Sequence, residues 1–203
     1  MSLDVETPHG LARVHLHSVA AARGALVLGH GAGGGVGAPD LVAATRAAQG
    51  ASFTVALVEQ PYRVAGRRSP ARAHQLDAAW TAVVARLRAD LGDLPLVTGG
   101  RSSGARVACR TAVATRAAGV VCLAFPLRPP GREVTRLDEL DAVPVPTLVV
   151  QGLRDPYGMP PPAPRRTVAQ VVGDHSLKGD LAGVAGAVSA WLADHGDEIG
   201  RAP

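Results

Sequence analysis

One serine motif is the strongest chemical signal in the sequence. The segment Gly100-Arg-Ser-Ser-Gly104 matches G-x-S-x-G, a pattern in which the central serine is a nucleophile. An apolar run precedes it and a helical pattern follows, so the serine falls in a tight strand-to-helix turn that needs small residues on both sides. The register selects Ser102 over its neighbour Ser103. The alternative is an ordinary glycine-rich turn with a surface serine.

An acid and a base follow two later apolar runs. Asp155 lies in Gly152-Leu-Arg-Asp-Pro, and His175 lies in Gly173-Asp-His-Ser. Because the carboxyl ends of parallel strands meet at one edge of a sheet, we expect both side chains beside Ser102. The chain order Ser, Asp, His also fits a G-x-S-x-G enzyme. His175 would then take the serine proton, and Asp155 would fix the histidine tautomer.

Other acidic residues and histidines are weaker candidates. Asp174 is the rival acid, but adjacent side chains in an extended segment point in opposite directions. Asp180 is expected to cap the last helix, and Asp138, Glu139 and Asp141 lie in a predicted loop. His30 is expected to hold its own loop by hydrogen bonding. The remaining histidines are expected to be non-catalytic: His9, His15, His17, His74 and His195.

A glycine-rich loop, Gly29-His-Gly-Ala-Gly-Gly-Gly35, follows the first predicted inner strand. A phosphate-binding loop is the alternative, but the Lys-Ser/Thr ending and the G-x-G-x-x-G spacing are both missing. Beside a nucleophilic serine, such a loop supplies one N–H of an oxyanion hole, and the residue after the serine supplies the other. We therefore expect the backbone N–H groups of Ala32 and Ser103 to fill these roles. Each such donor is typically worth ~3 kcal/mol of barrier.

Arginines near the predicted site suggest a binding function. Arg67 and Arg68 follow a predicted strand that ends at the same sheet edge as Ser102, and Arg101 precedes the serine directly. Guanidinium groups bind carboxylates and phosphates through two hydrogen bonds, so these three arginines are candidate substrate-binding residues. An equally open alternative is that Arg67 and Arg68 pair with acidic groups of the fold.

These residues need a sheet of parallel strands to bring them together. Short β-branched runs alternate with helical patterns, which indicates an α/β fold: a mostly parallel, twisted sheet with helices on both faces. The predicted strands are 13–17, 25–28, 54–58, 94–98, 119–123, 147–151 and 167–172, and the predicted helices are 39–48, 71–91, 104–117 and 181–193. We expect one domain over residues 1–203, and the Pro-rich loops are too short for a cap domain.

Composition excludes several classes of function. The net charge is +4, but the arginines are scattered, which argues against nucleic-acid binding. The first residues hold neither a basic nor an apolar stretch, so we expect no secretory leader, and no apolar run is long enough for a membrane span. Cys109 and Cys122 lie in apolar surroundings, as buried thiols do in a reducing compartment, so a cytoplasmic location is expected. No cluster has metal-ligand spacing, and we expect neither a metal nor another cofactor.

Together these motifs resemble the α/β-hydrolase superfamily over nearly the whole chain. The closer resemblance is to the hydrolase-like family of testis-expressed protein 30 and nonspecific-lethal complex subunit 3, carried by the motifs above with Gly66-Arg-Arg-Ser-Pro-Ala-Arg72. Dienelactone hydrolases are more distantly similar and carry a cysteine nucleophile instead of Ser102. The resemblance implies a three-layer α/β-hydrolase fold with a Ser, Asp and His site, and the family's substrates are not well defined. Because the loops are too short for a cap, we expect a serine hydrolase acting on small esters or thioesters. A catalytically silent interaction module is the alternative.

Overall fold

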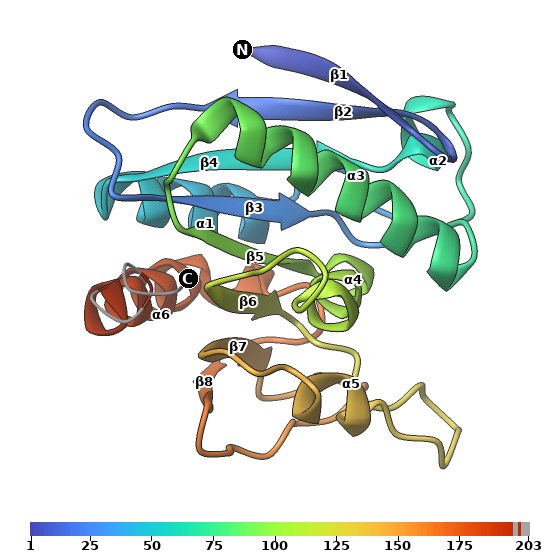
Figure 1. Cartoon of the computed structure of the whole chain (residues 1–203). Coiled ribbons are helices and arrows are strands. Elements are labelled where there is room, and N and C mark those ends of the chain that lie inside the picture. The colour runs from blue at the N-terminus through green and yellow to red at the C-terminus, as the bar shows by residue number, and fades with distance from the viewer. Residues whose placement is uncertain (197–198, 200–203) are drawn as a thin grey trace.

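An eight-stranded sheet runs through the computed structural model, which describes residues 1–196 and 199 (Figure 1). Strands β3 to β8 pair in parallel, whereas β1 and β2 add an antiparallel edge beside β4. In spatial order the strands are β1 (Ser2–Thr7), β2 (Gly10–His17), β4 (Phe53–Glu59), β3 (Gly24–Gly29), β5 (Leu96–Arg101), β6 (Gly119–Leu123), β7 (Thr147–Gly152) and β8 (Arg166–Val171).

Helices cover both faces of this sheet. Helices α1 (Pro39–Gly50) and α6 (Leu181–Asp194) pack on one face, and α3 (Ala73–Leu91), α4 (Ser103–Thr111) and α5 (Leu137–Asp141) pack on the other. Two short helices, α2 (Pro61–Val64) and the 3₁₀ helix η1 (Lys178–Asp180), lie in connections. The predicted mostly parallel, three-layer α/β fold is confirmed. The described residues between β6 and β7 hold only α5, so no cap domain is inserted there.

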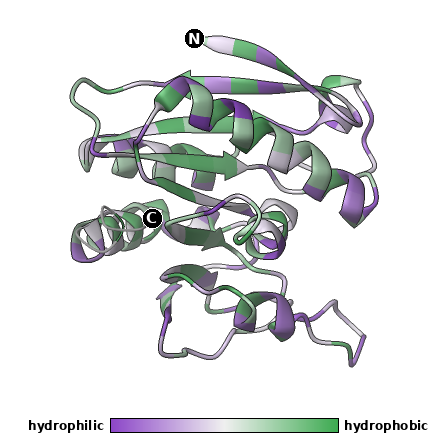
Figure 2. Ribbon diagram, viewed as in Figure 1, coloured by the Kyte–Doolittle hydropathy of each residue, from purple (hydrophilic) through white to green (hydrophobic). Residues whose placement is uncertain are grey.

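Successive side chains of the inner strands point to opposite faces of the sheet, so the hydrophobic core has one part on each face. In β3, Leu26 and Leu28 pack toward α1 and α6, while Ala25 and Val27 pack toward α3. All six residues of this strand are buried, as in a strand that is covered on both faces. Figure 2 shows hydrophobic colour along the central strands, with hydrophilic colour on the outer helix surfaces. Among the described residues, no helix is both long enough and apolar enough to cross a membrane.

Strand β1, strand β5 and helix α4 are among the elements that differ from the predictions. Strand β1 was not expected, because only Val5 of its six residues is buried and the alternating pattern is weak. Strand β5 begins two residues later than predicted and continues to Arg101. The helix predicted over 104–117 ends at Thr111, because the chain turns back at Arg116 (φ +47°) and Arg88 of α3 binds the carbonyl oxygens there.

The turn between β5 and α4 requires very close packing against β3. A Cβ atom on either Gly100 or Gly104 would lie 2.4 Å from the carbonyl oxygen of Gly29, well inside van der Waals contact. The prediction that small residues flank the serine at these two positions is therefore confirmed. Strand β3, strand β5 and helix α4 meet at this one carbonyl group.

This packing gives a first prediction. The Gly104→Ala variant should lose ~1–3 kcal/mol of unfolding free energy, because the new methyl group must displace the Gly29 backbone. Gly186→Ala is the matched control, since Gly186 is an exposed residue within α6 whose added Cβ meets nothing within 4 Å. The control should gain ~0.5–1 kcal/mol from helix propensity. Urea unfolding of both variants measures the difference, and equal stabilities would contradict the steric explanation.

Candidate active site

Ser102 occupies a strained turn at the end of β5. Its backbone angles are φ +51° and ψ −105°, a region that residues with a side chain rarely adopt. The Ser102 N–H donates a 2.9 Å hydrogen bond to the carbonyl oxygen of Leu123 on β6, which helps to hold this conformation. The chain enters α4 at the next residue. The serine side chain therefore stands at the carboxyl edge of the sheet, as its motif predicts.

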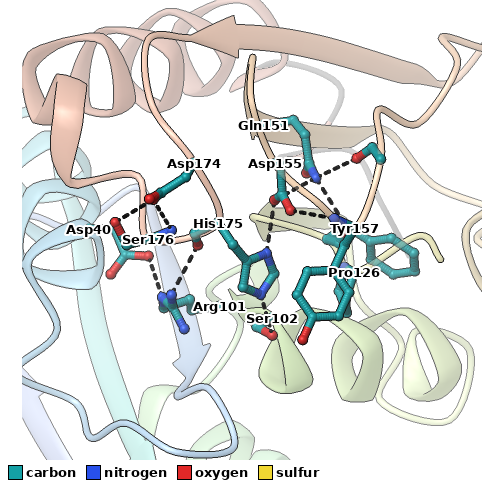
Figure 3. A network of polar contacts seen from close by, with 12 residues as sticks. Asp40, Arg101, Ser102, Pro126, Gln151, Asp155, Tyr157, Asp174, His175 and Ser176 are labelled. Atoms are coloured by element: carbon teal, nitrogen blue, oxygen red, sulfur yellow. Dashed lines mark hydrogen bonds and ion pairs between the residues drawn. The ribbon is translucent and has the colours of Figure 1, made fainter. Parts of the chain in front are cut away.

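The three residues predicted from separate loops lie in one line (Figure 3). The Nε2 atom of His175 is 2.9 Å from Oγ of Ser102, and its Nδ1 atom is 2.8 Å from Oδ2 of Asp155. The Asp155 side chain is 1% exposed and the His175 side chain 19% exposed. A carboxylate on Nδ1 favours the tautomer with its proton there, which leaves the Nε2 lone pair facing the serine hydroxyl.

Buried donors surround the Asp155 carboxylate. The Nε2 group of Gln151 donates to Oδ2 at 2.9 Å, and the N–H of Tyr157 donates to Oδ1 at 2.9 Å. The Nε2 group of Gln151 also donates to the carbonyl oxygens of Phe125 and Gly158. Its three partners are all acceptors, which fixes the orientation of the Gln151 side-chain amide. Gln151 was not expected from the sequence. Its only signal is a glutamine in a strand that is otherwise apolar.

A second unexpected residue, Tyr157, covers the histidine. The centres of the Tyr157 and His175 rings are 4.3 Å apart, with 37° between the ring planes. This distance is slightly shorter than the ~4.5–7 Å usual for aromatic pairs, so the two rings are in close contact. One face of the imidazole is thus covered by an aromatic ring, while Nε2 remains directed at Ser102 (Figure 3).

His30 holds the glycine-rich loop, as predicted. Its Nε2 atom accepts the N–H of Gln60 at 3.1 Å, so the ring proton is on Nδ1, which donates to the carbonyl oxygen of Gly31 at 2.8 Å. Burial lowers the pKa of His30, which keeps the ring neutral. The hydroxyl of Tyr62 donates to the carbonyl oxygen of Ala32 at 2.9 Å and gives the loop another anchor.

The glycine-rich loop borders the serine. A Cβ atom on Gly31 would be 3.7 Å from Cβ of Ser102, so the loop backbone runs directly beside the nucleophile turn. Within the described residues, the N–H of Ala32 has no hydrogen-bond acceptor. Ser103 is the first residue of α4, where backbone N–H groups lack partners inside the helix. Both groups remain candidate oxyanion donors.

The three candidate binding arginines separate into two groups. The guanidinium of Arg101 is engaged within the protein: its Nε lies 2.9 Å from Oδ2 of Asp40, and its Nη2 donates to the carbonyl oxygen of His175 at 3.0 Å. This differs from the predicted anion-binding role. Arg67 and Arg68 are exposed, and neither has an ion pair among the described residues.

Arg67 also lines a pocket of about 520 Å³. The pocket lies between the β1–β2 turn, the α2 region and the start of α3, and it includes Tyr62 and Gln75. Ser102, Asp155 and His175 are not among its lining residues. Tyr62 therefore connects this pocket with the glycine-rich loop, through its hydrogen bond to Ala32.

The remaining acidic residues have structural partners. Asp174 is exposed and accepts two hydrogen bonds from Ser176, which lower the pKa of its carboxyl group. Asp180 caps α6 by accepting the N–H of Gly183 at 2.7 Å, as predicted. The acidic cluster predicted in a loop instead forms helix α5, where Glu139 pairs with Arg106 of α4. No three His, Cys, Asp or Glu side chains of residues 1–196 and 199 gather as a metal site would require.

Comparison with solved structures supports the same architecture. A serine hydrolase without a lid from Xanthomonas campestris is 20% identical, with 96% of this chain and 94% of that chain covered and a TM-score of 0.77. Est1E from Butyrivibrio proteoclasticus is 13% identical (95% and 98% covered, TM-score 0.77), and dienelactone hydrolase from Anabaena variabilis is 18% identical (96% of each covered, TM-score 0.75). At these identities the likeness shows the fold alone. A search of curated protein sequences found no match.

A family model described as an alpha/beta hydrolase domain matches residues 22–180. The matched region begins just before β3 and ends with η1, so it contains the nucleophile turn and the loops that carry Asp155 and His175. It also covers more than half of the chain. On this match and the observed topology, the chain belongs to the alpha/beta hydrolase family.

Proposed function

We propose that this protein is a serine hydrolase that cleaves small carboxylic esters or thioesters through an acyl-enzyme on Ser102. One observation carries the proposal: Ser102, His175 and Asp155 form an unbroken series of hydrogen bonds, with 2.9 and 2.8 Å between the paired atoms. Nucleophile, base and orienting acid are thus within the reach that acyl transfer requires.

In the first half of the reaction, Oγ of Ser102 attacks the acyl carbon while Nε2 of His175 takes the hydroxyl proton. The negative charge that develops on the carbonyl oxygen would be stabilised by the N–H groups of Ala32 and Ser103. The bond to the alcohol or thiol then breaks, and His175 returns the proton to this leaving group. Asp155 stabilises the imidazolium that exists between the two transfers.

In the second half, water replaces the alcohol. His175 takes a proton from the water as its oxygen attacks the acyl carbon of the ester on Ser102. The acid product then leaves and Oγ recovers its proton. In both halves Nε2 of His175 takes and returns the proton at the same position while Asp155 holds Nδ1, so these two residues need not rearrange between acylation and deacylation.

Small or exposed substrates fit the open site. The described connections contain no cap domain over Ser102, and the similar structures include a hydrolase without a lid and Est1E with ferulic acid bound. Arg67 and Arg68 are exposed near the same sheet edge, so we propose that they favour substrates with an anionic group. The closer resemblance to testis-expressed protein 30 stays a prediction, as does the alternative of a silent interaction module.

Covalent labelling separates an enzyme from a silent module. A fluorophosphonate probe should label the wild-type protein and not Ser102→Ala, because the probe reacts with an activated serine nucleophile. Ser103→Ala is the matched control and should label normally, since it keeps the same backbone N–H. Mass spectrometry locates the adduct. A folded wild-type protein that does not react would support the silent module.

The orienting acid is tested by a pair of isosteric variants. Asp155→Asn should lower kcat for p-nitrophenyl acetate by ~10³–10⁴-fold, because a neutral amide no longer favours the required histidine tautomer. Asp174→Asn should stay within about threefold of wild type, because this exposed carboxylate contacts Ser176 and not the imidazole. A larger loss in Asp174→Asn would transfer the role of acid to Asp174.

The proposed anion preference is tested by substrate charge. The Arg67→Ala/Arg68→Ala double variant should lose about tenfold in kcat/KM for esters with a carboxylate on the acyl chain. Neutral esters of the same length should be almost unaffected, because they gain nothing from a guanidinium. Steady-state kinetics on matched ester pairs gives the ratio. An unchanged ratio would contradict the anion preference and leave the hydrolase proposal intact.

A further inference from the structure

Arg101 lies at the junction of the candidate active site. It is the last residue of β5 and directly precedes Ser102. Its Nε atom is 2.9 Å from Oδ2 of Asp40 in the first turn of α1, and its Nη2 donates to the carbonyl oxygen of His175 at 3.0 Å (Figure 3). The Arg101 side chain is 19% exposed and that of Asp40 only 1% exposed.

Asp40 places a buried charge beside this arginine. Its Oδ1 accepts the N–H of Leu41, whereas Oδ2 has no well-aligned hydrogen-bond donor among the described residues. Burial raises the pKa of Asp40, and the positive charge of Arg101 opposes that rise. Because a buried ion pair seldom adds stability over an apolar pair, its presence here calls for another role.

The glycine-rich loop leaves room for the guanidinium. A Cβ atom on Gly31 would stand 2.7 Å from Nη1 of Arg101, so a side chain at this position would displace the arginine. The guanidinium therefore fills a space between the glycine-rich loop, the start of α1 and the histidine loop, defined as residues 172–177. All three segments adjoin the nucleophile turn.

The histidine loop is attached to the rest of the protein by the buried side chain of Leu177 and by the hydrogen bond from the Arg154 N–H to the Gly173 carbonyl oxygen. Its own turn is closed by bonds between Asp174 and Ser176 and between Leu177 and Asp174. His175 is bound to the rest of the site at two ends: Asp155 holds its ring at Nδ1, and Arg101 holds its backbone carbonyl. Asp155 and the Tyr157 ring orient the imidazole, but the position of Nε2 relative to the serine also depends on where the His175 backbone lies.

We propose that Arg101, oriented by Asp40, is a positioning residue that fixes the backbone of His175 so that Nε2 stays aligned with Ser102. This inference rests on the proposed hydrolase function. The same strand thus presents the nucleophile and, one residue earlier, holds the base. The role acts through His175, so its loss should lower kcat for neutral and anionic substrates alike, whereas loss of a substrate-binding arginine should raise KM for anionic ones.

The test removes the pair together, because Arg101→Met alone would leave the Asp40 carboxylate buried without a counter-charge. Arg101→Met combined with Asp40→Asn keeps similar volumes but offers no donor to the His175 carbonyl. The matched control is Arg110→Met with Asp77→Asn, which removes a partly buried pair between α3 and α4. The single variant Arg101→Lys retains the positive charge but has only one nitrogen with which to contact Asp40 and the His175 carbonyl. It should therefore be more active than the double variant and less active than the wild type.

We expect the Arg101/Asp40 double variant to lose ~10–100-fold in kcat for p-nitrophenyl acetate, with KM within about threefold of wild type. The fluorophosphonate labelling rate should fall by a similar factor, while the Arg110/Asp77 control stays near wild type. A folded variant with unchanged kcat, or a loss confined to KM for anionic esters, would overturn the inference. If the double variant does not fold, an Arg101→Lys variant with full wild-type kcat would overturn it as well.

A readout independent of turnover separates this inference from the proposed function. The Nδ1–H proton of His175, hydrogen-bonded to Asp155, should give a downfield NMR resonance in the wild-type protein. This resonance should shift or broaden in the Arg101/Asp40 variant and not in the control. If the wild type fails to label with fluorophosphonate, the hydrolase function is wrong, and the resonance still decides whether Arg101 positions His175.

Discussion

The contact of β5 and α4 with the Gly29 carbonyl of β3 is the constraint on which the site depends. Because Gly100 and Gly104 have no side chains, the strand, the turn and the helix approach β3 closely enough to force Ser102 into φ +51°. Such a sparsely populated conformation costs roughly 1–3 kcal/mol for a residue with a Cβ atom. The packed sheet and the bond from Ser102 N–H to Leu123 offset that cost. In return, Oγ projects from the edge and the first N–H groups of α4 face the same space.

Two histidines near this turn show how surroundings separate a structural role from a chemical one. Both rings direct Nδ1 at an oxygen acceptor, Asp155 for His175 and the Gly31 carbonyl for His30. They differ at Nε2. In His30 this atom accepts the Gln60 N–H and has no lone pair left, whereas in His175 it faces the serine hydroxyl. Of these two rings, only that of His175 has an Nε2 lone pair directed at the hydroxyl of Ser102.

The sequence was sufficient for the parts of the site that depend on local pattern. Ser102, Asp155 and His175 each follow an apolar run, and parallel strands necessarily bring such positions to one edge. The sequence did not predict the contacts of Gln151, of Tyr157 or of the Arg101–Asp40 pair. Their roles depend on which segments meet after folding, and nothing near Arg101 in the sequence indicates that a helix start would supply its partner. Strand β1 was not predicted, because an exposed edge strand buries few side chains and so shows only a weak alternation of apolar and polar residues.

The Arg101–Asp40 pair also bears on substrate charge. An arginine bound to a buried carboxylate adds little net charge, so the pair contributes only a weak field to attract an anion. Its Nη2 donates to the His175 carbonyl and its Nη1 occupies the space beside Gly31, so only 19% of the side chain is exposed to a substrate carboxylate. Selectivity for anions, where it exists, must then come from exposed guanidinium groups such as Arg67 and Arg68. Orientation of the base and attraction of the substrate are thereby assigned to different arginines, and a change in one need not disturb the other.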